Sequence, residues 1–170
     1  RYSVPMTALL DANDLSSSDL SVGQRLFVPG AAISSAALRK ALGEYFAKPV
    51  FGRLSSPFGY RSDPFTGGRT FHTGIDLAAP TGTAVKATLD GSVATTGYST
   101  VYGNYVILTH PEGYQSLYAH LSSVGVMRGQ RVGQSAVIGR VGNTGYSTGS
   151  HLHFSVYRNG KMIDPRSVLK

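Results

Sequence analysis

Hydrophobic and polar residues alternate in short runs from Val50 onward, and glycine-rich turns separate the runs. Alternation with a period of two is typical of β-strands. The pattern predicts a mainly β domain with an antiparallel sheet over residues 50–170. Its candidate strands cover residues 84–87, 91–96, 104–109, 114–120, 136–141 and 151–157. Asn159-Gly160 then predicts a tight hairpin, because this pair favours a turn with two positive φ angles.

The first 30 residues show a different pattern. Residues 7–13 predict a short helix, and residues 22–30 predict a turn followed by a strand, with a serine-rich loop between them. Taken alone, these elements describe a generic helix-turn-strand unit.

Residues 31–49 predict a helical connector. Ser34 or Ser35 can cap a helix that runs through residue 47, and Pro49 ends it. One stripe of this helix is apolar at helical spacing and is expected to pack on the β domain; it consists of Leu38, Leu42, Tyr45 and Phe46.

Composition narrows the classes of function. The 170 residues include no cysteine, so disulfides and thiolate metal sites are excluded. The net charge of +7 suits anionic partners such as nucleic acid or cell-envelope polymers. The basic residues are scattered, however, and Arg39-Lys40 is the only adjacent pair, so we predict no nucleic-acid partner. No apolar stretch reaches the roughly 20 residues of a membrane span, and no signal peptide opens the chain, although a secreted protein would have lost it.

The first candidate for chemistry is His72 with Asp76, four residues apart just before an apolar run. A helix would bring such a pair together. Gly74 and the β-branched Ile75 argue instead for a bend that enters a strand. Without cysteine, any metal must be held by histidine, aspartate or glutamate, and both residues are possible zinc ligands.

The second candidate is His151 with His153. The strand period of two places both imidazoles on one face, while Leu152, Phe154 and Val156 face the core. A divalent metal would explain two neighbouring histidines on that face, and the ligands would come from two strands or strand edges.

The other two histidines are expected to differ. The alternation of residues 114–120 places Ser116, Tyr118 and His120 on one face, with His120 at the strand end, where its side chain can project into a groove. His110 shares a face with apolar neighbours and is predicted to be buried and hydrogen-bonded, with a weaker alternative in which it supports a histidine ligand.

Several spaced motifs then occur in one order along the chain: Ser56-Pro57-Phe58-Gly59-Tyr60-Arg61, His72 with Asp76, Tyr118-Ala119-His120-Leu121, Gly142-Asn143-Thr144-Gly145, Ser147-Thr148-Gly149-Ser150-His151-Leu152-His153-Phe154 and Asp164-Pro165. Through these motifs, residues 51–169 resemble the lysostaphin-type (LytM-like) zinc metalloendopeptidase family. Residues 1–30 resemble the second half of a LysM module, a small glycan-binding domain, whose first strand and helix would be missing here.

The resemblance implies a role for each site residue. His72, Asp76 and His153 would hold Zn²⁺, and His120 and His151 would be the catalytic pair; which of the two is the base stays open. Three protein ligands leave room for water or substrate, as in a catalytic zinc site. The implied function is hydrolysis of peptide cross-links in bacterial peptidoglycan by an extracytoplasmic enzyme, which we expect to be a monomer.

Three loops are expected to wall a narrow groove: residues 60–70, 97–103 and 144–150. They are rich in small residues and tyrosine, which suits glycine- and D-alanine-containing peptides.

Three alternatives remain at this point. The first is a non-catalytic regulator of other wall hydrolases on the same fold, although no ligand is missing here. The second is an adhesive wall protein with a structural metal. The third is a latent enzyme whose N-terminal segment covers the groove, with Asn13 or Asp14 at the open metal position. Unchanged activity after removal of residues 1–48 would refute this last hypothesis.

Overall fold

The computed structural model describes residues 4–30 and 46–169, in a chain that divides into two compact units, Arg1–Leu38 and Arg39–Lys170. The first unit contains the helix α1 (Met6–Asp11), which confirms the predicted short helix to within two residues. Residues 22–23 form the predicted turn, but the predicted strand that follows it is wrong. A strand needs a partner for its ladder of hydrogen bonds, and no strand is formed anywhere in residues 4–30.

The Asn13 side chain makes the backbone hydrogen bonds to Phe27 that a neighbouring strand would otherwise make. Its Oδ1 accepts from the Phe27 backbone N–H and its Nδ2 donates to the Phe27 carbonyl, both at 2.6 Å. Nδ2 also donates to the Leu9 carbonyl at 2.7 Å. These bonds occupy the Asn13 amide within its own unit, which opposes the hypothesis that Asn13 ligates a metal.

Most of the predicted connector helix, residues 31–45, lies outside the described residues. The prediction that it continues through residue 47 is wrong, because Phe46 forms a β-bridge with Leu169. Phe46 is buried and its ring meets Tyr114 edge-on at 5.3 Å. Packing of this residue onto the β domain is therefore confirmed, with an extended backbone instead of a helix.

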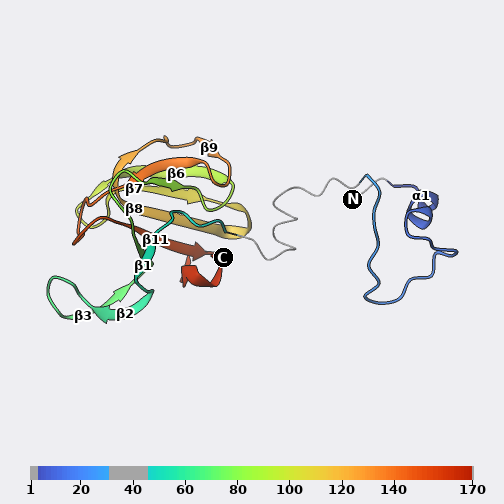
Figure 1. Cartoon of the computed structure of the whole chain (residues 1–170), viewed down its shortest axis with the longest axis horizontal. Coiled ribbons are helices and arrows are strands. Elements are labelled where there is room, and N and C mark those ends of the chain that lie inside the picture. Colours follow the sequence, from blue (N-terminus) through green and yellow to red (C-terminus); the bar gives the residue numbers. More distant parts are fainter. Residues whose placement is uncertain (1–3, 31–45, 170) are drawn as a thin grey trace. The chain divides into compact units, whose positions relative to one another are not determined.

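The second unit is built around a ten-stranded antiparallel sheet (Figure 1). Its main path runs β1-β4-β11-β8-β7-β6-β9; β10 pairs with β5 and β8, and β12 pairs with β11. The sheet strands are β1 (Arg53–Ser56), β4 (Ile75–Ala78), β5 (Ala84–Lys86), β6 (Gly91–Ser99), β7 (Gly103–Thr109), β8 (Tyr114–Val124), β9 (Arg131–Val132), β10 (Val137–Val141), β11 (His151–Arg158) and β12 (Lys161–Ile163).

A separate hairpin of β2 (Gly59–Ser62) and β3 (Arg69–His72) projects beyond β1 (Figure 1). Two short 3-10 helices complete the unit, η1 (Pro111–Gly113) and η2 (Pro165–Ser167). Among the described residues, none of the helices combines the length and the apolar character that crossing a lipid bilayer requires.

The mainly β, antiparallel fold is confirmed, and all six candidate strands exist. The β11–β12 hairpin is also confirmed, since Asn159 and Gly160 both have positive φ. One boundary matters for the site: β8 continues to Val124, so His120 lies inside the strand and not at its end.

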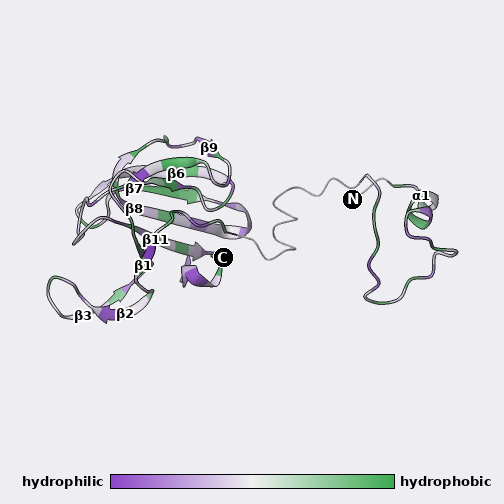
Figure 2. Cartoon of the chain, viewed as in Figure 1, coloured by the Kyte–Doolittle hydropathy of each residue, from purple (hydrophilic) through white to green (hydrophobic). Residues whose placement is uncertain are grey.

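The apolar side chains of the central strands form the core. Leu152, Phe154 and Val156 of β11 are fully buried, as the alternation predicts, and Tyr118 of β8 packs on Phe154 with ring centroids 5.2 Å apart. Figure 2 shows hydrophobic residues concentrated on these inner strands and hydrophilic residues on the β2–β3 hairpin. The site lies between the sheet and this hairpin.

Candidate functional site

His72 and Asp76 flank a tight connection between the hairpin and the sheet. His72 ends β3, Ile75 begins β4, and Thr73-Gly74 turns the chain between them, which confirms the predicted bend. A side chain at Gly74 would place its Cβ 2.3 Å from the Phe154 carbonyl oxygen, so only glycine lets the turn lie this close to β11. Asp76 pairs with His153 across the β4–β11 ladder and shares its face of the sheet.

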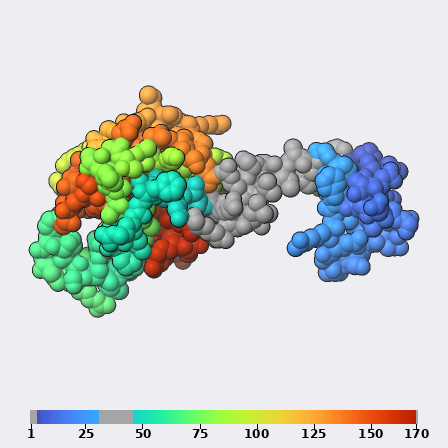
Figure 3. Space-filling model, in the orientation of Figure 1, coloured from blue at the N-terminus to red at the C-terminus, as the bar shows by residue number. Residues whose placement is uncertain are grey.

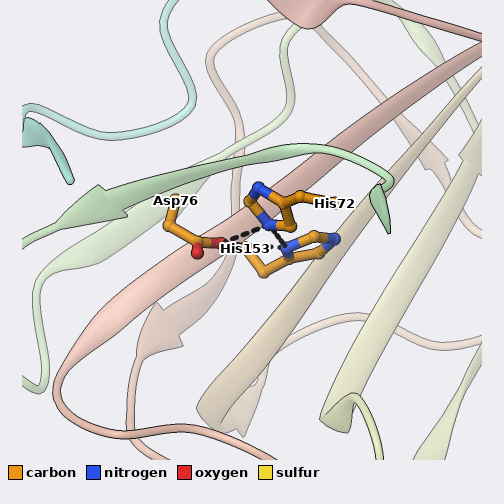
Figure 4. A group of neighbouring side chains, drawn as sticks. All are labelled: His72, Asp76 and His153. Carbon is orange, nitrogen blue, oxygen red and sulfur yellow. Dashed lines mark hydrogen bonds and ion pairs between the residues drawn. The ribbon is translucent and has the colours of Figure 1, made fainter. Parts of the chain in front are cut away.

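The ligand triad of His72, Asp76 and His153 is buried and converges on one point (Figure 4). His72 Nε2 lies 3.0 Å from Asp76 Oδ1 and 3.0 Å from His153 Nδ1, and the last two atoms are 2.9 Å apart. The atoms of a triangle with such sides lie about 1.7 Å from its centre, which is less than zinc bond lengths of about 2.0–2.2 Å. One zinc ion can therefore contact all three atoms.

Each ligand is oriented by a second contact on its far side. The Pro57 carbonyl lies 2.8 Å from His72 Nδ1, the Ser155 hydroxyl 2.9 Å from His153 Nε2, and Arg61 Nη1 3.0 Å from Asp76 Oδ2. Such outer contacts fix ring orientation and tautomer in metal sites.

The tautomer of His72 shows that the donor set fits a cation. A carbonyl oxygen only accepts, so Nδ1 must donate its proton to Pro57. In the neutral ring, Nε2 then presents a lone pair to the Asp76 carboxylate. Two acceptors at 3.0 Å repel each other unless a proton or a metal ion lies between them. The triad therefore fits a metal ion.

Burial sets the charge states of the triad. Burial opposes ionisation of Asp76, but the adjacent imidazoles of His153 and His72 outweigh it and lower the pKa of Asp76 far below its ordinary value. Burial also lowers the pKa of His153, because it disfavours the imidazolium. An ionised carboxylate and a neutral imidazole are the forms that bind a metal.

His120 reaches the site through a β-bulge in β8. Ala119 and His120 together oppose one residue of β7, Tyr105, and His120 has a φ of 60°. Tyr118 packs on Phe154 in the core, whereas the His120 ring lies 4.7 Å from that of His151. The prediction that Ser116, Tyr118 and His120 share a face is therefore wrong, because the bulge turns His120 to the site.

The two histidines of the predicted catalytic pair present the same nitrogen to the site. His120 Nδ1 donates to the Thr144 carbonyl at 2.7 Å, and His151 Nδ1 donates to the Gly149 carbonyl at 2.8 Å. This leaves Nε2 as the second nitrogen of each ring; that of His151 lies 3.6 Å from Asp76 Oδ1, and the His120 ring lies 5.9 Å from that of His153. Burial lowers the pKa of His120 to about 4, so its Nε2 is unprotonated at neutral pH.

His110 lies apart from the site. Its Nδ1 contacts the Asp90 carbonyl at 2.9 Å and its Nε2 the Ser116 hydroxyl at 2.7 Å. It is buried, and burial lowers its pKa. The prediction of a buried, hydrogen-bonded side chain is confirmed. The suggestion that His110 supports a metal ligand is wrong, because both ring nitrogens are bonded elsewhere.

Two cavities of about 310 and 400 Å³ adjoin the triad, share His120 and His153 in their walls, and together form the groove. All three predicted loops contribute to its walls: the first through Arg61, Asp63, Pro64 and Thr70, the second through Val101 and Tyr102, and the third through Tyr146 to Ser150. Small residues line one end of it: Ser55, Ser56, Ser147, Thr148, Gly149 and Ser150.

Sequence reasoning assigned no specific contact to three residues that the structure places around the site, although two of them belong to the predicted groove loops. Ser155 had a usable signal, since the period of two puts it on the same face as His151 and His153. Arg61 stood within a motif, but nothing in its spacing indicates a contact with Asp76. Tyr146 lies in a loop, and its contact across the groove depends on tertiary structure alone.

Two known protein families and a solved peptidase structure are similar to this chain. The sequence model described as Peptidase family M23 matches residues 70–165, which is more than half of the chain, and that of the LysM domain matches residues 1–29. The catalytic domain of the antimicrobial peptidase lysostaphin from Staphylococcus simulans is similar in structure, with a TM-score of 0.62 and 33% identity over 68% of this chain and 90% of that domain.

Two curated proteins are similar in sequence. DD-carboxypeptidase/endopeptidase Mpg of Neisseria meningitidis serogroup B is 48% identical over 119 residues, 70% of this chain and 27% of that protein. Peptidoglycan DD-endopeptidase ShyC of Vibrio cholerae serotype O1 is 38% identical over 163 residues, 95% of this chain and 34% of that protein. The chain thus spans about a quarter to a third of the length of these relatives.

Proposed function

Because the chain belongs to peptidase family M23, as the resemblance to lysostaphin-type enzymes predicts, we propose that it is a zinc-dependent endopeptidase that hydrolyses peptide cross-links of bacterial peptidoglycan. One observation carries the proposal. Three ligand atoms within 3.0 Å of one another face a groove into which two further imidazoles, those of His120 and His151, also project.

His72, Asp76 and His153 would hold the metal. Two imidazole nitrogens and one carboxylate oxygen form a typical ligand set for catalytic zinc. When bound, zinc supplies Lewis acidity, which polarises a carbonyl group and lowers the pKa of water from about 15.7 toward roughly 7. The contacts of Pro57, Ser155 and Arg61 keep the three ligand atoms directed at one point.

His120 and His151 would divide the proton transfers. His120 is the better general base, because burial keeps it neutral and the Thr144 carbonyl fixes its proton on Nδ1, which leaves the Nε2 lone pair free. His151 Nε2 lies 3.6 Å from Asp76 Oδ1, at the edge of the triad, where it would donate a hydrogen bond to the developing oxyanion. His120 would then pass the proton to the leaving amine.

The substrate class rests on the groove and on the relatives. Small side chains along one end leave room for an extended peptide of small residues such as glycine and alanine. The similar protein of Vibrio cholerae is named a peptidoglycan DD-endopeptidase, and the N-terminal match to LysM fits a wall glycan as a second ligand. A substrate of this kind places the enzyme outside the cytoplasm, and we propose that it acts there as a monomer, without a nucleic-acid partner.

The alternative of a non-catalytic regulator is less well supported. A regulator needs neither metal ligands nor free imidazoles, whereas this site has both, each oriented by hydrogen bonds. An adhesive protein with a structural metal would need ligands that enclose the ion, while the triad opens to the groove.

Digestion of purified peptidoglycan tests the proposal. Zinc-loaded wild type should release fragments with new peptide termini, identified by mass spectrometry. The His120→Ala variant should retain zinc but lose about a hundredfold or more in rate, since it lacks the base. His153→Ala should lose both zinc and activity. Absence of new termini from wild type on every cross-link type would overturn the proposal and favour the regulator.

A further inference from the structure

A contact between two loops crosses the groove above the ligand triad. Tyr146, in the loop before β11, donates its hydroxyl to Asp63 Oδ1 at 3.0 Å, and its ring lies 4.1 Å from that of Phe65 at the tip of the β2–β3 hairpin. We call these three residues the bridge. Figure 3 shows the hairpin, in green, and the loop before β11, in orange to red, as touching protrusions.

The two cavities of the groove adjoin this bridge, since Tyr146 lines both of them and Asp63 lines the second. One is bounded by Ser55, Ser56 and the loop 147–150, and the other by Phe71, Thr73, Val101 and Tyr102. Both are lined by Tyr146 and Pro64, and both reach His120 and His153. We therefore infer that the bridge stands where the two cavities meet, next to His120 and His153, which both cavities reach.

A closed bridge would admit a peptide that has a free end and exclude one that is attached at both ends. A peptide with a free end can enter one cavity and pass beneath the bridge to the other. A cross-link in intact peptidoglycan is attached at both sides to glycan strands too wide for the opening, so it cannot be threaded. It can enter only from the side, which requires the two loops to part.

The bridge is built to open without unfolding either loop. The hairpin tip holds itself together, because Asp63 Oδ1 also accepts from the backbone N–H groups of Phe65 and Thr66 at 3.0 and 2.9 Å. The opposite loop is fixed by the Tyr146 N–H, which donates to the Val101 carbonyl. Among the described residues, the Tyr146–Asp63 bond is the one hydrogen bond between hairpin tip and loop. Tyr146 and Phe65 are 46% and 52% exposed, so water competes for the contact.

We propose that the bridge is a gate that determines substrate specificity: it must open for a cross-link still attached to glycan, but not for a peptide with a free end. The inference rests on the proposed peptidase function and adds a selection by substrate topology. Tyr146, Phe65 and Asp63 are its specificity-determining residues.

A reversible comparison of a joined and an unjoined bridge tests this. The full chain contains no cysteine, so Phe65→Cys and Tyr146→Cys provide the only two thiols. A short bis-maleimide joins them, and N-ethylmaleimide on the same double variant is the matched control. Each form is assayed on intact peptidoglycan and on the same peptides after an amidase has removed the glycan.

Joining the loops should lower cleavage of intact peptidoglycan by at least about tenfold relative to the control, while glycan-free peptides are cut within about threefold of the control rate. In a second variant, Tyr146→Phe, the hydrogen bond is lost and the ring contact stays, so the ratio of polymer to free-peptide cleavage should rise about two- to fivefold. Equal losses on both substrates, or no loss on the polymer, would overturn the gate. If wild type cuts neither substrate, the proposed function itself fails.

Discussion

Removal of one buried hydroxyl, in Ser155→Ala, should weaken zinc binding without touching a ligand. The Ser155 hydroxyl lies 2.9 Å from Nε2 of His153, and both residues are buried. Its loss frees the imidazole to rotate and leaves a buried N–H without its partner. Loss of such an outer contact typically lowers metal affinity about 10- to 100-fold, or roughly 1.4–2.7 kcal/mol, and the unpaired group costs about 1–3 kcal/mol of folding stability.

The chain contains a matched control in Ser116→Ala. Ser116 is as fully buried as Ser155, lies on the neighbouring strand, and also contacts Nε2 of a histidine, His110 at 2.7 Å. His110 has no part in the triad. Ser116→Ala should therefore lose folding stability to a similar or larger extent and keep the zinc affinity of wild type.

Two measurements on the purified full chain separate the effects. Urea unfolding of metal-free protein gives the stability loss of each variant, and competition with a chromogenic chelator gives the zinc dissociation constant. Equal zinc affinities for the two variants would refute the reasoning, because the Ser155 hydroxyl would then contribute to packing alone.

Three further predictions concern the same site. Arg61→Ala should lower zinc affinity about tenfold, because Asp76 Oδ2 loses the guanidinium that orients the carboxylate, and Arg61→Lys should recover part of it in the same chelator assay. In metal-free protein, the pKa of His120 is about 4 when folded and about 6.5 when unfolded, so the unfolded chain binds more protons between these values. The free energy of unfolding should thus be independent of this group above pH 6.5 and fall by about 3 kcal/mol as the pH drops to 4. Urea unfolding of wild type and of His120→Gln measures this, and the same pH dependence in both proteins would contradict it. Zinc at about a thousand times its dissociation constant should raise the free energy of unfolding by about 4 kcal/mol. If the thermal melting temperature is the same with and without a chelator, the protein binds no metal.

The sequence alone was enough to predict the central strands of the sheet and the residues that meet in the site, but not β1, β2, β3 or β9. Strand alternation separates His151 and His153 from the core face of β11, and the glycine between His72 and Asp76 indicates a bend. These signals are local, and the structure brings all five residues together. The zinc identity and the catalytic roles stay predictions.

The incorrect predictions have a common cause: each concerns a feature that depends on contacts with residues distant in the chain. The strand predicted in residues 22–30 has suitable residues but no neighbour to pair with. His120 shares a face with Tyr118 by alternation, and nothing in its side chain signals a positive φ, which glycine would have done. The bridge between Tyr146 and Asp63 likewise joins loops 83 residues apart.

The bulge at His120 also bears on how such a protein could change its role over evolutionary time. Deleting one residue at Ala119 would restore regular pairing with β7 and move the imidazole to the position that Ala119 now occupies, opposite His153, instead of its present place beside His151. The sheet would survive the loss, and so would the capacity to chelate an ion. A descendant of that kind would keep the three candidate metal ligands while its proposed proton acceptor is displaced, so the loss of one residue would be enough to impair the proposed hydrolysis and leave metal binding intact.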